Sequence, residues 1–190
     1  TDFNVDNVCF LDTDILISPI APNVFDSYDG ECLGLVSQVK KLPYPIESVL
    51  RRVAFFRHHE YSKDYPLDSA LFMRPRQIFK HMGTMEFDDY VCSGVFLFNL
   101  KNHSSLLKAW FDAYTKDTKT LTTGEEPIFN AKAFEYGKIT WLDYQFQAIW
   151  LYEMAWKFPF LYREHRDNDA VIKSCVHASL LENYFLHFAG

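Results

Sequence analysis

The 190-residue chain is long enough to bury the core of one folded domain, so we expect residues 1–190 to form a single domain. Hydrophobic residues make up 48% of it and aromatic residues 17%, a composition far from that of a disordered segment. The net charge is −6 and no basic run occurs. This argues against nucleic acid binding, which needs clustered Lys and Arg to neutralise phosphates.

The first part of the chain alternates strand and helix patterns. Residues 7–17 contain four consecutive apolar residues, as expected for a strand buried on both faces of a parallel sheet, and are then interrupted by two carboxylates. Residues 33–37 predict a second strand. Residues 46–60 predict a helix because their apolar positions recur at helical spacing. The proline-containing stretch at 60–82 predicts a loop and a short helix.

The remaining part continues this alternation. Asn102 is a candidate cap for a helix over 103–117, and the glutamates and proline at 125–127 favour the first turn of a short helix ending at 134. The aromatic-rich residues 144–160 favour neither helix nor strand. Further strands are predicted at 91–100, at 139–143 and within 182–190. Strands that alternate with helices indicate an α/β fold with a mostly parallel sheet flanked by helices.

Four cysteines are scattered along the chain without a C-x-x-C pair, so neither a zinc ribbon nor a thioredoxin-type motif is present. No apolar stretch approaches the roughly 20 residues that a membrane span needs, and the first residues do not form a signal peptide. A reducing compartment is the simpler assumption for such cysteines, and we expect a cytoplasmic location.

Asp12 and Asp14 are the clearest chemical feature of the sequence. In an extended chain, side chains two residues apart point the same way, so both carboxylates can converge on one cation. They follow an apolar strand, and ligand sites in open α/β sheets lie beyond the carboxyl ends of the strands. Carboxylate oxygens suit Mn²⁺ or Mg²⁺. The alternative is a purely structural role, in which one Asp starts a turn and the other caps it.

The segment FLDTDILI resembles the D-x-D segment of glycosyltransferases with the GT-A fold, particularly the glycogenin-like family 8. Three further segments follow in that family's order. CSGVFLFNLKNHS resembles its asparagine-serine-glycine-valine strand, EEPIFNAKAF is similar to its D-Q-x-x-x-N helix, and LHFAG matches its H-F-x-G ending. Together these segments extend over nearly the whole chain.

This resemblance implies a GT-A-like α/β fold and transfer of a sugar from a nucleotide-diphosphate donor, such as a UDP-sugar, to a carbohydrate or glycoconjugate acceptor. It implies that Asp12, Asp14 and His187 hold a Mn²⁺ (or Mg²⁺) that bridges the donor's diphosphate, and that the reaction retains the anomeric configuration. Such an ion acts as a Lewis acid on the departing nucleotide diphosphate. Taken alone, a histidine in an apolar strand is more often a core residue than a ligand.

The resemblance also places Ser93, Gly94 and Gly190 on the donor side. Gly94 would let the chain approach the sugar closely, because glycine lacks a side chain, although a kink or bulge in a strand explains it equally well. Cys92 replaces the family's asparagine, so sugar recognition is expected to differ.

Glu126 takes the place of the family's aspartate in the following helix, and Pro127 that of its glutamine. Glu126 is therefore the candidate catalytic residue, whose carboxylate would reach a sugar hydroxyl. A glutamate at a helix N-terminus is also favourable simply because of the helix dipole.

Two parts of the family pattern have no counterpart. The βαβ region that grips the nucleotide base would precede the D-x-D strand, and relatives continue beyond the final glycine with a basic residue. We therefore expect a fragment truncated at its N-terminus, with a sheet edge that self-association could cover.

Two other functions stay open on sequence grounds. One is a non-catalytic sugar-binding, metal-binding or interaction domain on the same scaffold. The other is a haloacid-dehalogenase-like phosphatase, which also begins with an apolar strand and D-x-D. It is disfavoured because Ile15 and Leu16 follow the second aspartate, where a small residue and Thr or Val are usual.

Overall fold

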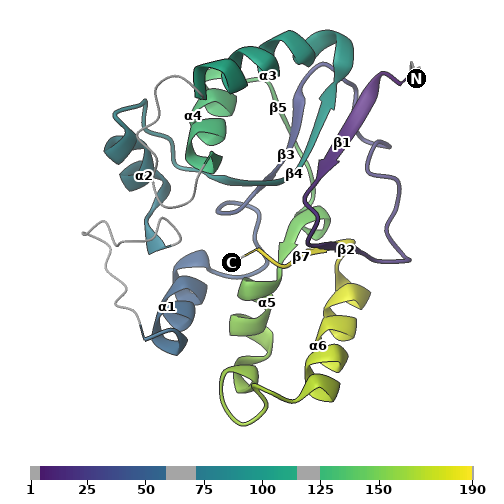
Figure 1. The fold of residues 1–190 in the computed structure, drawn as a ribbon, viewed down its shortest axis with the longest axis vertical. Coiled ribbons are helices and arrows are strands. Elements are labelled where there is room, and N and C mark those ends of the chain that lie inside the picture. Colours follow the sequence, from purple (N-terminus) through teal and green to yellow (C-terminus); the bar gives the residue numbers. More distant parts are fainter. Residues whose placement is uncertain (1–4, 59–71, 115–124, 190) are drawn as a thin grey trace.

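The computed structural model describes residues 5–58, 72–114 and 125–189, which form two sheets with helices around them (Figure 1). The strands are β1 Asn7–Leu11, β2 Ile15–Ile17, β3 Leu33–Ser37, β4 Val91–Asn99, β5 Ile139–Trp141, β6 Ala148–Ile149 and β7 Phe185–His187. The helices are α1 Ile46–Phe56, α2 Pro75–Met82, α3 Leu100–Tyr114, α4 Glu126–Tyr136, α5 Trp150–Lys157 and α6 Asp169–Glu182. Two short 3-10 helices occupy Tyr144–Gln147 and Pro159–Tyr162.

The larger sheet has the strand order β1-β4-β3-β5 and the smaller one the order β2-β7-β6. The α/β fold is confirmed, but the expected predominance of parallel pairing is wrong for the described strands. β4 is antiparallel to both β1 and β3, and β2 is antiparallel to β7, whereas only β3–β5 and β6–β7 are parallel. The long connection between β3 and β4 returns the chain to the same end of the sheet, where Ser37 pairs with Val91. Alternation of strands and helices along a sequence does not fix whether neighbouring strands run parallel or antiparallel.

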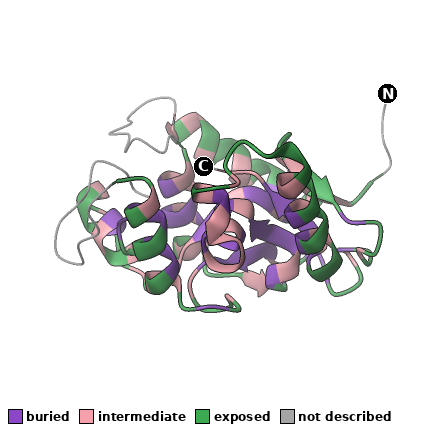
Figure 2. Ribbon diagram, turned by 90° about the horizontal axis from the view of Figure 1, so that it is seen from below, coloured by how far each residue is buried: buried purple, intermediate pink, exposed green. Residues whose placement is uncertain are grey.

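β4 supplies apolar side chains to both faces of the larger sheet because its residues alternate between the faces. Phe96 and Phe98 pack on the side covered by α3 and α4, together with the buried Leu33 and Leu35 of β3. On the opposite face, buried side chains of β3 and β4 pack against the segment after β2 and against Phe146 and Phe185. Figure 2 shows these central strands as the buried part of the molecule, with exposed residues on the outer helices.

Most predicted elements are present within one to four residues of their expected bounds. One difference concerns the start of α3, which begins at Leu100 directly after β4. Asn99, rather than Asn102, caps it, since the Asn99 Oδ1 accepts from the backbone N–H groups of Lys101 and Asn102 at 3.0 and 3.1 Å. The end of the predicted helix, residues 115–117, lies outside the described residues.

The last third of the chain was the least predictable. Residues 144–160 divide into a 3-10 helix, the short strand β6 and the helix α5, and α6 was not predicted at all. The apolar residues of α6 are spread around the helix and do not mark one face of it, and only Cys175 and Ser179 are buried. Its pattern therefore carries a weak helix signal. In Figure 1, α5 and α6 lie next to the smaller sheet, with α1 beside α5.

Candidate metal centre

The D-x-D motif forms the turn between the two sheets. β1 ends at Leu11 and β2 begins at Ile15, and Asp12 and Asp14 lie between them. The Asp12 N–H donates to the Gly94 carbonyl at 2.9 Å, and the Asp14 carbonyl accepts from the Phe188 N–H at 3.0 Å. We expected an extended chain at Asp12 and Asp14, but the structure has a turn here. Two backbone hydrogen bonds fix this turn.

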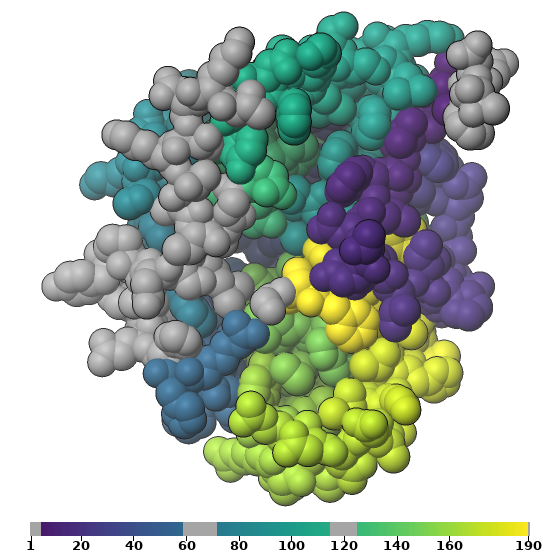
Figure 3. All heavy atoms as spheres, in the orientation of Figure 1, coloured from purple at the N-terminus to yellow at the C-terminus, as the bar shows by residue number. Residues whose placement is uncertain are grey.

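His187 reaches this turn through the smaller sheet. β7 is the middle strand of that sheet, and His187 is the register partner of Ile15, the residue after Asp14. In Figure 3 the C-terminal residues lie against the N-terminal ones near the middle of the face shown. The His187 Nε2 lies 3.2 Å from the Asp14 Oδ1 and 3.6 Å from the Asp12 Oδ2. One ligand atom from each of the three residues falls within a mutual distance of 4.8 Å.

The three side chains differ in exposure. His187 is 2% exposed, so its ring is held by packing, whereas the side chains of Asp12 and Asp14 are 41% and 50% exposed. Burial raises the pKa of Asp12; the imidazole of His187 acts in the opposite direction, and the carboxylate of Asp14 raises it further. A cation between the carboxylates would offset both the desolvation and the like-charge repulsion.

Gly94 makes room for the cluster. A Cβ atom at this position would overlap the His187 ring carbon Cε1 and would lie 2.8 Å from the Nδ1 and 2.9 Å from the Asp12 Oδ2. Distances below 3.0 Å are not tolerated by real Cβ atoms. Close packing of two candidate ligands therefore requires a glycine at position 94. The expected irregularity of the strand is present as well, because the pairing of β4 with β3 shifts register between Phe96 and Val91, on either side of Gly94.

Cys92 lies in β4, two residues before Gly94, and contacts the imidazole ring of His187. Its Sγ is 3.6 Å from the His187 Nδ1, the ring nitrogen that faces away from the carboxylates. With Nε2 as a ligand to a cation, Nδ1 would carry the ring proton and would donate a hydrogen bond to the sulfur, which would fix the orientation of the ring. From the sequence, Cys92 was identified only as a substitution in the family pattern, and nothing in the sequence indicated this contact.

Glu126 approaches the same strand from the first turn of α4. Its Oε2 accepts from the Ser93 N–H at 3.4 Å. Burial raises the pKa of Glu126 above its ordinary value and outweighs the hydrogen bonds from Cys92, Ser93 and Tyr90, which lower it. Asn130 fixes α4 over the start of β4: its Oδ1 accepts from the Val91 N–H at 2.7 Å and its Nδ2 donates to the Val91 carbonyl at 2.8 Å.

The structure thus brings together most of the predicted site residues. Asp12, Asp14 and His187 meet at one point, Gly94 lies beneath them, and the Ser93 backbone joins them to Glu126. Gly190 lies outside the described residues. His58 and His81 are exposed and do not belong to the cluster.

The donor set fits a divalent cation. Two carboxylate oxygens and one imidazole nitrogen are a combination that Mn²⁺ accepts, and Gly94 leaves the ligand atoms the space that a side chain would fill. Within residues 5–58, 72–114 and 125–189, this is the one group of three or more such side chains that could hold a metal ion.

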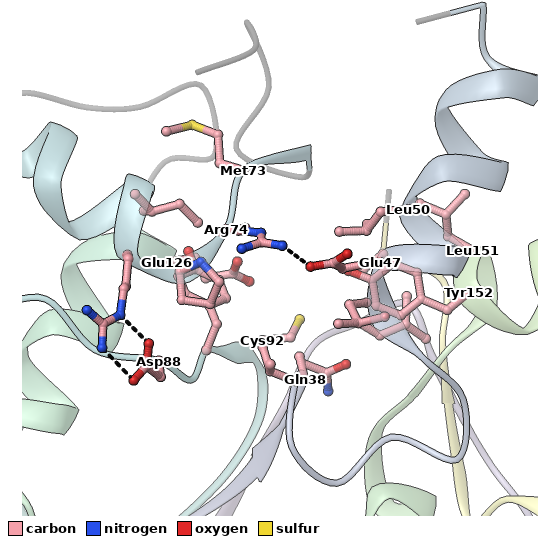
Figure 4. Close-up of a pocket in the computed structure, with 18 of the residues that line it drawn as sticks. Gln38, Glu47, Leu50, Met73, Arg74, Asp88, Cys92, Glu126, Leu151 and Tyr152 are labelled. Carbon is pink, nitrogen blue, oxygen red and sulfur yellow. Dashed lines mark hydrogen bonds and ion pairs between the residues drawn. The ribbon is translucent and has the colours of Figure 1, made fainter. Parts of the chain in front are cut away.

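A cavity of about 660 Å³, shown in Figure 4, is linked to the cluster through Cys92, which lines it and contacts His187. Cys92 and Glu126 lie at one end of it, and Ala189 continues from the β7 strand into its wall. The rest of the lining comes from the segment after β3, from α1, α2 and α5, and from residues next to these elements, such as Arg57 after α1 and Tyr90 before β4. No sequence pattern predicted this cavity, because its walls come from segments that are far apart in the chain.

No protein-family model and no curated protein matches this sequence. Solved structures do resemble the fold. The bifunctional glycosyltransferase WbbM, solved in its apo form, matches 98% of this chain with a TM-score of 0.54 and 16% sequence identity. Two structures of LgtC match the whole chain at 15% identity with TM-scores of 0.49 and 0.47; one is an active-site mutant and the other a galactosyltransferase complex with donor and acceptor sugar analogues.

The chain spans 29% of the WbbM chain and 55% and 54% of the two LgtC chains. Among the helices of the described segments, none is both long and apolar enough to cross a membrane. At such low sequence identity, the likeness concerns the arrangement of strands and helices. This chain therefore has the α/β fold of GT-A-type glycosyltransferases.

Proposed function

We propose that this chain carries the divalent-cation site of a glycosyltransferase that moves a sugar from a nucleotide-diphosphate donor, such as a UDP-sugar, to a carbohydrate or glycoconjugate acceptor. The observation that carries this proposal is the meeting of Asp12, Asp14 and His187 at one point, with ligand atoms within 4.8 Å of one another. The glycosyltransferase-like fold supports it independently.

The roles of the side chains follow from their positions. Asp12, Asp14 and His187 would hold Mn²⁺ (or Mg²⁺), which when bound supplies positive charge to the leaving diphosphate. His187 is fixed by burial and by Cys92, so the ligand set is largely preorganised and little ordering is needed on binding.

Glu126 is the carboxylate best placed to bind a sugar hydroxyl beside this site. It lines the cavity and is joined to β4 through the Ser93 N–H. Its buried carboxylate is a strong hydrogen-bond acceptor for a hydroxyl group. Among the groups described here, no side chain is set apart as a nucleophile, so catalysis rests on positioning and charge stabilisation, with retention of configuration as the family resemblance implies.

Calorimetric titration of UDP in the presence and absence of Mn²⁺ tests this proposal. Asp14→Asn keeps the shape of the side chain and removes one ligand charge. Asp26→Asn makes the same charge change at an exposed carboxylate that is not part of the cluster, and serves as the matched control. We expect UDP binding only with Mn²⁺, a loss of at least tenfold in affinity for Asp14→Asn, and wild-type binding for Asp26→Asn.

Two results would contradict the proposed function. Binding of Mn²⁺ without UDP by the folded protein would favour a non-catalytic metal-binding domain on this scaffold. Equal binding of UDP with and without the metal would contradict the role of the cluster altogether.

A further inference from the structure

The cavity beside the metal centre is a site separate from the three candidate ligands, and none of them lines it. Its volume of about 660 Å³ lies within the roughly 300–1,000 Å³ typical of pockets for small organic ligands. Two of its lining residues, Cys92 and Glu126, also belong to the surroundings of the metal centre. A molecule bound in the cavity would therefore lie next to the bound donor.

The end of the cavity nearest the metal centre is polar and accepts hydrogen bonds. Gln38 is only 5% exposed, and within the described part of the chain its Oε1 has no hydrogen-bond partner, although its Nε2 donates to the Gln147 carbonyl at 3.5 Å. A buried amide oxygen without a partner is unfavourable unless a ligand or water satisfies it. Glu126 adds a carboxylate at the same end (Figure 4). Hydroxyl groups of a ligand are the donors that complement both.

The opposite wall of the cavity is apolar. Leu50 of α1 and Leu151 and Tyr152 of α5 lie together on one side in Figure 4, and Met73 lies at another edge. These four side chains are each less than 9% exposed in the protein, so the wall is part of the packed core and keeps its shape. A bare sugar, hydroxylated all round, would leave this wall without an apolar partner.

Of the three arginines that line the cavity, two are paired with carboxylates, and the third, Arg57, is exposed just after α1. Arg74 pairs with Glu47, and Arg76 forms a two-pronged ion pair with Asp88, in which one N–O distance is 2.8 Å. The guanidinium groups of Arg74 and Arg76 are engaged with carboxylates, so this part of the rim is poorly suited to bind the diphosphate of a donor. Between Glu126 and the apolar wall, the chemistry of the cavity matches a ligand with a hydroxylated end and an apolar end.

We propose that this cavity binds the acceptor, and that the acceptor is an amphipathic glycoside. Its sugar hydroxyls would face Gln38 and Glu126 beside the metal centre, and an apolar aglycone would lie against Leu50 and Leu151. This inference rests on the proposed function, since it names the substrate class that the transferase would use.

The test compares octyl and methyl glycosides of glucose, galactose, mannose and N-acetylglucosamine, each below the micelle concentration of the octyl form. Binding is followed by NMR of protein labelled with ¹³C at the methionine methyl groups. Met73 lines the cavity, whereas Met85 is 65% exposed and does not, so Met85 is an internal control. We expect at least one octyl glycoside to shift the Met73 signal and not the Met85 signal.

That octyl glycoside should bind at least tenfold more tightly than its methyl counterpart, because burial of about two methylene groups is enough to raise the affinity tenfold. Ile46→Gln places a polar group in the cavity wall at a half-buried position and should reduce this preference. Leu181→Gln, at a residue 60% exposed on α6 and outside the cavity, should leave it unchanged. Gln38→Leu should weaken binding of the octyl glycoside by removing the amide oxygen.

Equal affinity for octyl and methyl glycosides would overturn the proposal, as would the absence of binding by all four octyl forms or a shift of Met85 in place of Met73. These measurements need neither metal nor nucleotide. If octyl glycosides bind but UDP shows no Mn²⁺-dependent binding, the cavity is a glycoside site and the proposed transferase function is refuted. If UDP binds with Mn²⁺ but no octyl glycoside binds, only the assignment of the cavity is refuted.

Discussion

Replacement of Gly94 by alanine adds one carbon atom where β4 passes beneath two of the candidate metal ligands. The new Cβ would overlap the His187 Cε1 and lie 2.8 Å from the Nδ1 and 2.9 Å from the Asp12 Oδ2. Ordinary contact begins at 3.4 Å, so at least one ligand must move by about 0.5 Å or more. His187 is 2% exposed and cannot move without disturbing its neighbours.

The expected effect has two parts. Overpacking of this kind costs about 1–3 kcal/mol of folding stability. A binding site must also be held to within about 0.5 Å of its working geometry, and changes in the groups that orient metal ligands typically lower metal affinity by about 10- to 100-fold. We therefore expect Gly94→Ala to fold with reduced stability and to bind Mn²⁺ at least tenfold more weakly.

Gly34→Ala is the matched control. Gly34 lies in β3, and a Cβ there would be 2.8 Å from the Cβ of Leu97, a similar clash that involves no candidate ligand. Urea unfolding without metal measures the stability of both variants, and titration of free Mn²⁺ by electron paramagnetic resonance measures affinity. Both variants should lose stability, but only Gly94→Ala should lose Mn²⁺ affinity. Wild-type Mn²⁺ affinity in folded Gly94→Ala would refute this reasoning, as would an equal loss in both variants.

Three further predictions concern stability. Burial raises the pKa of Glu126, so this residue stabilises the folded state at acidic pH, and that contribution is lost as the pH rises through the folded-state pKa. In urea unfolding, the stability of wild type relative to Glu126→Gln should therefore fall from acidic towards neutral pH. A difference that does not depend on pH would contradict this. Asn99→Ala should cost about 1 kcal/mol through loss of the α3 cap, measured by the same method, and an unchanged midpoint would rule the cap out. Glu153→Ala should cost about 1–3 kcal/mol, because it removes the fully buried carboxylate that accepts from Tyr144 and Ser179, whereas Lys157 keeps Glu182 as a partner at 2.6 Å. A thermal melt unaffected by the change would exclude that role.

Local sequence patterns predicted most of the elements because their signals are short-range. The apolar runs at 8–11 and 91–98 are strands, and the helical spacing at 46–54 is a helix. The same patterns failed where tertiary contacts decide. The apolar residues of α6 surround the helix and mark no single face, so no amphipathic pattern identified it. Asn99 became a cap because β4 ends there and not at Asn102.

By itself, the sequence indicated the α/β class, and its resemblance to glycosyltransferase segments pointed to Asp12, Asp14 and His187 as candidate ligands, because a D-x-D pair after an apolar strand and an H-F-x-G ending are local patterns. Only the tertiary structure decided how they meet: β2 pairs with β7 and brings His187 to Asp14, and β1 pairs with β4 and sets Asp12 over Gly94. Strand direction, the thiol behind His187 and the cavity beside Glu126 likewise depend on pairings between segments far apart in the chain. Such pairings are fixed by the packing of the whole core, which no local pattern encodes.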